Sequence, residues 1–173
     1  LLEMKGLSTL IKAFSLLEHE NLKLLLVGSG EYKDKMLKIA GDLGISHNLI
    51  FTDSVPAEDV PKYINCMDVL VLPSITTSGW VEFFGRVLVE AMVCRVPVIG
   101  SSSGEIPNVV GDAGLIFHEG DERDLKDKLD MVIKDVDLRQ SLIEKGYDRA
   151  TSLFIWESIG KDTYTVYKEL MGY

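Results

Sequence analysis

The sequence has few of the residues that build disulfide frameworks, metal sites or membrane spans. It contains two cysteines, Cys66 and Cys94, and three histidines in 173 residues, without metal-ligand spacing. No apolar run approaches the roughly 18 residues of a transmembrane helix, and no signal peptide precedes the first helical pattern. We therefore expect no metal, two reduced core cysteines and a cytoplasmic location.

Positive charge is also scarce. Lys and Arg number 18 against 27 Asp and Glu, which gives a formal net charge of -9. A nucleic-acid backbone or an anionic lipid surface would be repelled by such a chain rather than attracted to it. We expect no nucleic-acid partner and a small ligand instead.

Apolar residues, at 46%, are abundant enough for one domain with a sizeable core, spanning residues 1–173. Short apolar runs predict strands at 21–27, 49–52, 69–72, 96–99 and 114–117. Apolar residues at helical spacing predict helices at 7–18, 31–43, 59–66, about 85–96 and from 121 onward. This alternation is typical of a Rossmann-like, three-layer α/β domain with a mostly parallel sheet, helices on both faces and a ligand crevice at the carboxyl ends of the strands.

Some local features are expected to be purely structural. Gly28-Ser29-Gly30 is interpreted as a turn, because Lys33 stands where a dinucleotide fingerprint needs its third glycine. Residues 101–107 are expected to form a flexible polar loop. Asp121 or Asp137 is expected to cap the helix that follows it.

The stretch from Leu72 to Ser103 holds the strongest candidate site. A strand closed by Pro73 leads through a polar loop into a helix whose N-terminus favours an anion such as phosphate. Glu82 lies just before this helix and Glu90 about one turn inside it; a carboxylate can accept two hydroxyl hydrogen bonds from a sugar diol. Spacing alone favours a plainer interpretation of Glu90, as the partner of Arg86 in an exposed helical ion pair.

The sequence E-F-F-G-R-V-L-V-E-A-M-V-C-R-V-P-V-I-G resembles the paired-glutamate signature of the group 1 glycosyltransferases. These are retaining enzymes of GT-B fold, and their signature commonly reads E-G-F-G, a hydrophobic residue and three further residues, then E-A-M-A-x-G-x-P-V-I. The chain differs from it at Phe83, Arg86 and Arg95. The resemblance, which runs from residue 1 to about 167, implies the C-terminal, nucleotide-sugar-binding half of such an enzyme.

The resemblance also implies residue roles. Glu82 would bind hydroxyls of the transferred sugar and stabilise the positive charge that develops at its anomeric carbon. Glu90 would bind the ribose diol, and Lys5 would neutralise charge on the leaving diphosphate. Backbone amides would hold that diphosphate at Phe84, Gly85, Arg86 and Val87. Contacts to the base would come from Thr52, Asp53, Ser54 and Val55. No metal and no cofactor besides the donor are implied.

Plainer alternatives remain open for these residues and for the function. Lys5 could be a solvated lysine at a helix start, and residues 52–55 an ordinary strand-to-helix loop. A nucleotide-sugar epimerase of the same fold, or a nucleotide-binding fragment without activity, would show the same cleft. If the protein is a transferase, its acceptor is a glycan, a lipid or a small molecule that binds to an N-terminal domain, which we expect to be absent from this chain. The parent enzyme could associate peripherally with a membrane, and the isolated chain would be inactive.

The family also places a strand ahead of Lys5, between the strands expected at 21–27 and 69–72, and we expect it to be missing here. Two unpaired edges would then face a gap. We hypothesise that the gap is closed by direct pairing of the two strands, by a segment of another molecule or by other residues of the parent protein. Closure without the family's strand would displace residues 1–6.

Overall fold

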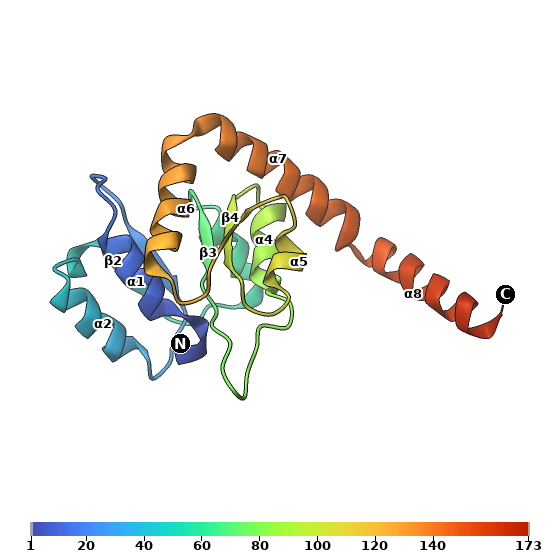
Figure 1. Cartoon of the computed structure of the whole chain (residues 1–173), viewed down its shortest axis with the longest axis horizontal. Helices are drawn as coiled ribbons and strands as arrows, with labels where there is room; N and C mark the ends of the chain where they lie inside the picture. Colours follow the sequence, from blue (N-terminus) through green and yellow to red (C-terminus); the bar gives the residue numbers. More distant parts are fainter. Residues whose placement is uncertain (1, 173) are drawn as a thin grey trace.

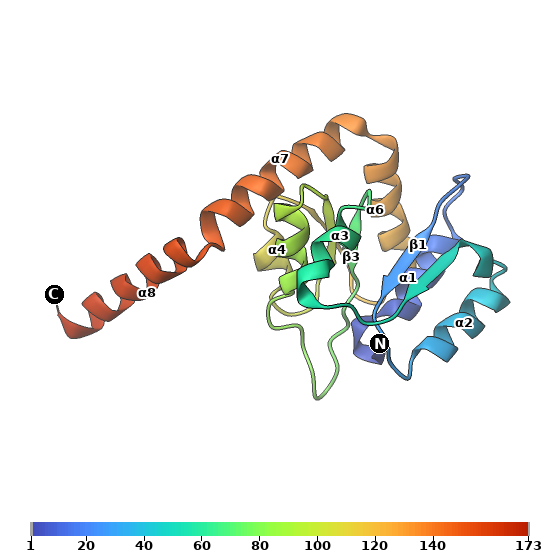
Figure 2. The ribbon, with the colours of Figure 1, turned by 180° about the vertical axis from the view of Figure 1, so that it is seen from behind.

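The computed structural model describes residues 2–172, and it is an α/β domain with a long C-terminal helical extension (Figures 1 and 2). The strands within this range are β1 (Leu24–Val27), β2 (Leu49–Thr52), β3 (Leu70–Leu72), β4 (Val98–Ser101) and β5 (Leu115–Phe117). The α-helices are α1 (Leu7–Ser15), α2 (Lys33–Asp42), α3 (Val60–Ile64), α4 (Arg86–Val93), α5 (Ile106–Val110), α6 (Glu122–Lys134), α7 (Val136–Leu153) and α8 (Trp156–Met171). Short 3-10 helices are η1 (Glu3–Lys5), η2 (Ser46–Asn48) and η3 (Ala57–Asp59).

The predicted elements are all present, but several boundaries differ. The strand expected at 49–52 has those bounds, whereas the strand expected at 96–99 begins at Val98 and ends at Ser101. Val96 is excluded because its amide donates to the carbonyl of Ala91, a hydrogen bond that closes the C-terminal end of α4. An apolar run in the sequence does not show where the hydrogen bonds of a preceding helix end. The predicted strand boundaries were therefore wrong by two residues.

The strands form two parallel sheets rather than one. β1 pairs with β2, and β4 lies between β3 and β5. Within residues 2–172 no backbone hydrogen bond joins β1 to β3, so closure of the gap by direct pairing was wrong. The two other ways of closing it stay predictions.

Side chains connect the two sheets where backbone pairing does not. Alternate residues of the three-stranded sheet point to opposite faces, as its pleat requires. One face joins Ile99 and Phe117 to α1, α2, α6 and Leu26 of β1 in a single core cluster. The other face joins Leu70 and Val98 to α3, α4 and α5. The first cluster therefore spans the gap and holds the β1–β2 sheet against the rest of the domain.

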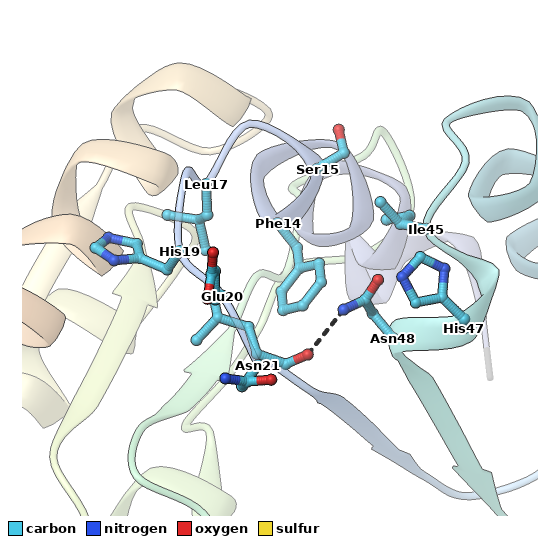
Figure 3. A pocket seen from close by; sticks show the side chains of 10 residues that line it. Phe14, Ser15, Leu17, His19, Glu20, Asn21, Ile45, His47 and Asn48 are labelled. Atoms are coloured by element: carbon cyan, nitrogen blue, oxygen red, sulfur yellow. Dashed lines mark hydrogen bonds between the residues drawn. The ribbon is translucent and has the colours of Figure 1, made fainter.

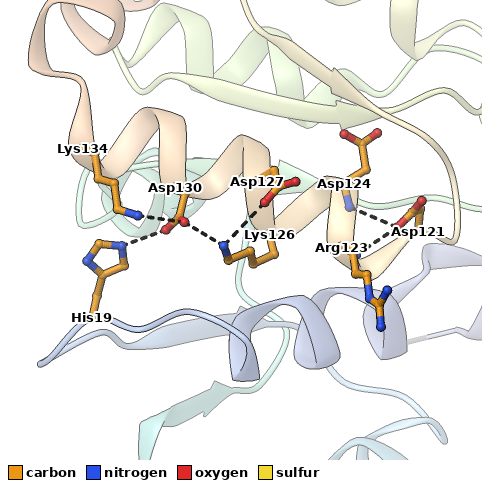
Figure 4. Close-up of polar contacts among 8 residues, drawn as sticks. All are labelled: His19, Asp121, Arg123, Asp124, Lys126, Asp127, Asp130 and Lys134. Carbon is orange, nitrogen blue, oxygen red and sulfur yellow. Dashed lines mark hydrogen bonds and ion pairs between the residues drawn. The ribbon is translucent and has the colours of Figure 1, made fainter.

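Three local expectations need correction or refinement. Asp121 caps α6 by accepting from the amides of Arg123 and Asp124 (Figure 4), but α7 is capped by Asp135 and not by Asp137. Cys66 and Cys94 are free as expected, yet Cys66 is exposed and is not a core residue. The segment expected to be a flexible loop at 101–107 is instead packed: it contains fully buried serines and the start of α5.

Asp130 on α6 is the centre of a charged cluster that ties this helix to the loop after α1 (Figure 4). Its carboxylate lies 2.8 Å from His19 Nε2 and 2.9 Å from the Nζ atoms of both Lys126 and Lys134. Burial acts to raise the pKa of Asp130, but these three donors outweigh it and hold the pKa well below its usual range. The charged form of Asp130 is thus favoured by folding.

This cluster predicts a stability effect that depends on pH. Because the folded-state pKa is depressed, the stabilisation is present above the unfolded value of 3.8 and is lost as pH falls below it. Asp130→Asn should lower the free energy of unfolding by about 1–3 kcal/mol at pH 7. In urea denaturation, the difference in free energy of unfolding between wild type and Asp130→Asn should be smaller near pH 3 than at pH 7. Asp127→Asn on the same helix is the control, because Asp127 is exposed and pairs only at 3.5 Å. An equal loss in both variants would contradict the assignment.

The last helix, α8, extends away from the domain (Figures 1 and 2). None of its described residues is buried, and Trp156, Tyr164, Tyr167 and Leu170 are all exposed. Within residues 2–172 these side chains are therefore not buried against the domain. No helix in this range is both long and apolar enough to cross a membrane.

Candidate functional site

The β3–α4 connection places a helix N-terminus at the carboxyl edge of the three-stranded sheet. Gly85 is the N-cap of α4 with φ +80°, and no side chain caps the helix. A Cβ atom at Gly85 would lie 2.7 Å from Leu72 Cδ2 and 3.1 Å from Leu88 Cδ1, so the close packing needs glycine. The amides at the start of α4 are thereby left without a side-chain acceptor, as an anion site requires.

Glu82 lies just before this helix and is held by two donors. Its Oε2 atom is 2.7 Å from Lys5 Nζ and accepts a hydrogen bond from Ser74 Oγ at 2.8 Å. Only 13% of the Glu82 side chain is exposed. The Lys5 ammonium also lies over the Trp80 ring, 4.6 Å from its centroid. The structure thus brings together two of the predicted residues, which are 77 positions apart in the chain, and adds Ser74 and Trp80 to them.

Lys5 is placed by a segment that packs tightly on the end of β3. Gly6 follows η1 with φ +65°, and a Cβ atom there would lie 1.7 Å from the carbonyl oxygen of Pro73. The amide of Ile75 donates to the carbonyl of Met4 at 2.8 Å. Residues 4–6 are thus docked against the start of the β3–α4 loop. The displacement of residues 1–6 stays a prediction because it depends on closure of the gap; Leu1 lies outside the described residues.

Glu90 forms the ion pair that its spacing suggested. Its Oε1 atom lies 3.1 Å from Arg86 Nε, and the Arg86 side chain is 83% exposed. The plainer interpretation of Glu90 is therefore a real contact of this structure. The contact engages one carboxylate oxygen and does not test the ribose role.

Residues 52–55 lie at the carboxyl end of the other sheet. Ser54 Oγ accepts from the amide of Ser29 and lies 2.8 Å from Ser29 Oγ, so the turn after β1 and the loop after β2 are side by side. The Gly28-Ser29-Gly30 turn therefore borders the predicted base-contact segment. In the described part of the chain, no hydrogen bond or ion pair connects Thr52–Val55 to Lys5 or Glu82.

A cavity of about 420 Å³ lies elsewhere, at the amino ends of β1 and β2 (Figure 3). Phe14, Leu17 and Ile45 contribute apolar lining, and His19 and His47 are at its rim. Asn48 and Leu22, which both line it, are joined by a hydrogen bond from the Asn48 side-chain amide to the Leu22 carbonyl. Ligands of open α/β sheets bind at the opposite, carboxyl edge, so this cavity is not the predicted site.

Sequence reasoning missed Ser74 and Trp80. Ser74 follows a buried strand at its carboxyl end, which is where ligand sites of this architecture form, and that position was an available signal. Trp80 is a single aromatic residue in a polar loop; an antiparallel bridge with Thr77 places it under Lys5. Nothing in the sequence around Trp80 indicates that contact.

The fold and the site define an α/β domain with an uncapped helix N-terminus, a lysine and two carboxylates at the carboxyl edge of a parallel sheet. That arrangement is typical of a protein that binds a phosphorylated, hydroxyl-bearing ligand. The sequence profile of "Glycosyl transferases group 1" matches residues 1–149. The chain belongs to this family of glycosyltransferases.

Individual proteins agree with the family assignment. N-acetyl-alpha-D-glucosaminyl L-malate synthase of Bacillus anthracis is 30% identical over 98% of this chain and 43% of its own length. Sucrose-phosphate synthase of Thermosynechococcus elongatus is 26% identical with a TM-score of 0.82, over 98% of this chain and 43% of that protein. Anabaena HepE, solved with UDP-glucose, is 23% identical with a TM-score of 0.85, over 98% of this chain and 46% of that one. The chain thus has the fold of a GT-B glycosyltransferase domain and spans less than half the length of these proteins.

Proposed function

We propose that this chain is the donor-binding half of a retaining glycosyltransferase. The parent protein transfers a sugar from a nucleotide-diphosphate sugar to an acceptor hydroxyl. The observation that carries the proposal is the Lys5–Glu82 contact beside the uncapped N-terminus of α4, because it places a cation, a carboxylate and free amides at one edge of the sheet. Membership of the family and the likeness to a protein that binds UDP-glucose support a nucleotide sugar as ligand.

In this proposal the diphosphate binds at the start of α4. The amides around Phe84, Gly85, Arg86 and Val87 and the helix dipole hold its oxygens, and Lys5 neutralises part of the charge that develops as the diphosphate leaves. Glu82 accepts hydrogen bonds from hydroxyls of the sugar and stabilises the positive charge at the anomeric carbon. The acceptor hydroxyl attacks from the face that the diphosphate leaves, so the configuration is retained and no protein nucleophile is needed.

The nucleoside part follows the same edge of the domain. Glu90 accepts the ribose diol through a carboxylate whose other contact, with Arg86, is exposed and easily exchanged. The backbone of Thr52–Val55, held by the contact between Ser29 and Ser54, borders the base. No metal is assigned a role.

The acceptor site is assigned to the part of the protein outside this chain. A glycan, a lipid or a small molecule would bind there, and the parent enzyme would work in the cytoplasm, with peripheral membrane association when the acceptor is a lipid. The isolated chain is expected to bind the donor without transferring its sugar. A role in epimerisation gains no support from the described residues of the site, to which we assign no separate acid and base.

A panel of UDP, GDP and ADP tests the proposed function. One of these nucleotides at 100 times its dissociation constant should stabilise the folded chain by about 2.7 kcal/mol. For a domain of this size the melting temperature should rise by roughly 5–10 °C. Absence of a shift with all three nucleotides and with their sugars would overturn the assignment.

Glu90→Ala tests the ribose contact. Loss of a charged acceptor should weaken nucleoside diphosphate binding by about tenfold or more, measured by calorimetry. Arg86→Ala is the matched control, because it removes the same ion pair while keeping the backbone amide at position 86. If Glu90 serves only the helical pair, Glu90→Ala will leave affinity unchanged in a folded protein.

A further inference from the structure

Ser74 is a fully buried serine placed against the Glu82 carboxylate. It follows Pro73 at the end of β3, its exposed fraction is 0%, and its hydroxyl donates to Glu82 Oε2 at 2.8 Å. Its own carbonyl accepts a 2.6 Å hydrogen bond from Ser101 Oγ at the end of β4, and Ser101 is buried to the same degree. Ser74 is thus fixed from the sheet side before it reaches Glu82.

The loop between Ser74 and Glu82 is held by its backbone at several points. Thr76 donates its amide to Glu119 at 2.7 Å, and its hydroxyl lies 3.0 Å from Ser103 Oγ. The carbonyl of Glu82 accepts from the amide of Glu105 at 3.0 Å. These contacts fix the path of the loop but leave the side-chain torsions of Glu82 free. Among residues 2–172, the hydrogen bonds to the carboxylate itself come from Lys5 and Ser74.

Both contacts fall on the same oxygen. Oε2 accepts from Lys5 and from Ser74, and within the described chain Oε1 accepts from neither. An ionised carboxylate has about four acceptor positions, so Oε1 keeps its full capacity. A buried donor on a strand end restricts the Glu82 rotamer more than Lys5 can, because Lys5 is a long, partly exposed side chain.

We propose that Ser74 is a positioning residue, which anchors Oε2 of Glu82 so that Oε1 is presented to a hydroxyl of the transferred sugar. This inference rests on the proposed function, in which Glu82 binds that sugar. Ser74 itself touches no substrate. Its effect should therefore appear in recognition of the sugar and not of the nucleotide.

The positioning role is tested by calorimetry of the chain with UDP and with UDP-glucose. If the chain binds GDP or ADP instead, that nucleotide and its sugar take their place. Ser74→Ala removes the donor, and Ser74→Cys nearly preserves the volume while leaving only a weak S–H donor. Both variants should keep UDP affinity within about twofold and weaken UDP-glucose binding roughly tenfold. Ser103→Ala is the control, since Ser103 is equally buried but contacts Thr76 instead of Glu82.

A second measurement separates positioning from packing. In a Glu82→Ala background, Ser74→Ala should change UDP-glucose affinity by less than about twofold, because the group that it positions is gone. An undiminished effect in that background, an equal effect of Ser103→Ala, or parallel losses for UDP and UDP-glucose would each overturn the inference. If the wild-type chain binds neither ligand, the proposed function itself fails, and that result is distinct from all of these.

Discussion

Glu82→Gln should lower the rate of sugar transfer by about a hundredfold in a protein that includes the acceptor half, and leave binding of free nucleoside diphosphate nearly unchanged. The amide preserves the shape of the side chain and one acceptor oxygen but removes the negative charge. In the proposed mechanism that charge acts at the sugar, where it binds hydroxyls and stabilises the positive charge at the anomeric carbon, and not at the nucleotide. The loss should therefore fall on kcat rather than on nucleotide affinity.

The measurement is steady-state transfer combined with nucleotide calorimetry on the same preparations. Glu105→Gln is the matched control: Glu105 donates its amide to the Glu82 carbonyl, but its side chain contacts Asn108 and not the site. It should keep wild-type kinetics. Wild-type turnover by Glu82→Gln, or a loss confined to nucleotide binding, would refute the proposed role of this carboxylate.

The second large effect is expected at Gly6. A Cβ atom there would lie 1.7 Å from the Pro73 carbonyl oxygen, and the residue has φ +65°. Gly6→Ala must therefore either strain the backbone or push residues 2–5 off the end of β3. We expect the free energy of unfolding to fall by roughly 3 kcal/mol or more, or Lys5 to leave Glu82 and donor binding to weaken.

Gly44→Ala separates backbone strain from the clash. Gly44 has φ +73°, but nothing lies within 4 Å of a Cβ atom built on it, so only the left-handed conformation is penalised. Its replacement should cost about 1 kcal/mol in urea denaturation. If Gly6→Ala costs no more than Gly44→Ala and donor affinity is unchanged, then the docking of residues 4–6 on β3 is not what places Lys5.

Much of the fold followed from local patterns. The apolar run at 49–52 and the helical spacing in α1, α4 and α6 were sufficient to predict these elements. The periods of strands and helices, two and 3.6 residues, appear directly in the order of apolar residues along the sequence. Boundaries were less secure where a cap or a turn decides them. Asp135 rather than Asp137 caps α7, because its side chain accepts a hydrogen bond from the amide of Leu138. The sequence, with two aspartates close together, does not show which of them is the cap.

The candidate site divides in the same way. Glu82, Gly85 and Glu90 lie close together in sequence, and their pattern identified the family that the comparisons show. The split into two sheets, the Ser74 contact and the place of Trp80 were not predicted. Each of them depends on segments that are distant in the chain or on the path of an irregular loop.

The sequence alone determined an α/β domain with a helix N-terminus and two carboxylates near it, because the secondary-structure periods and the glycine-containing motif are local. Only the tertiary structure decided that Lys5 reaches Glu82 across 77 positions and that Ser74 is buried against the same carboxylate. It also decided that β1 and β3 do not pair. The physical reason is that these contacts depend on how whole elements pack, and side-chain packing, unlike periodicity, is a property of the assembled core.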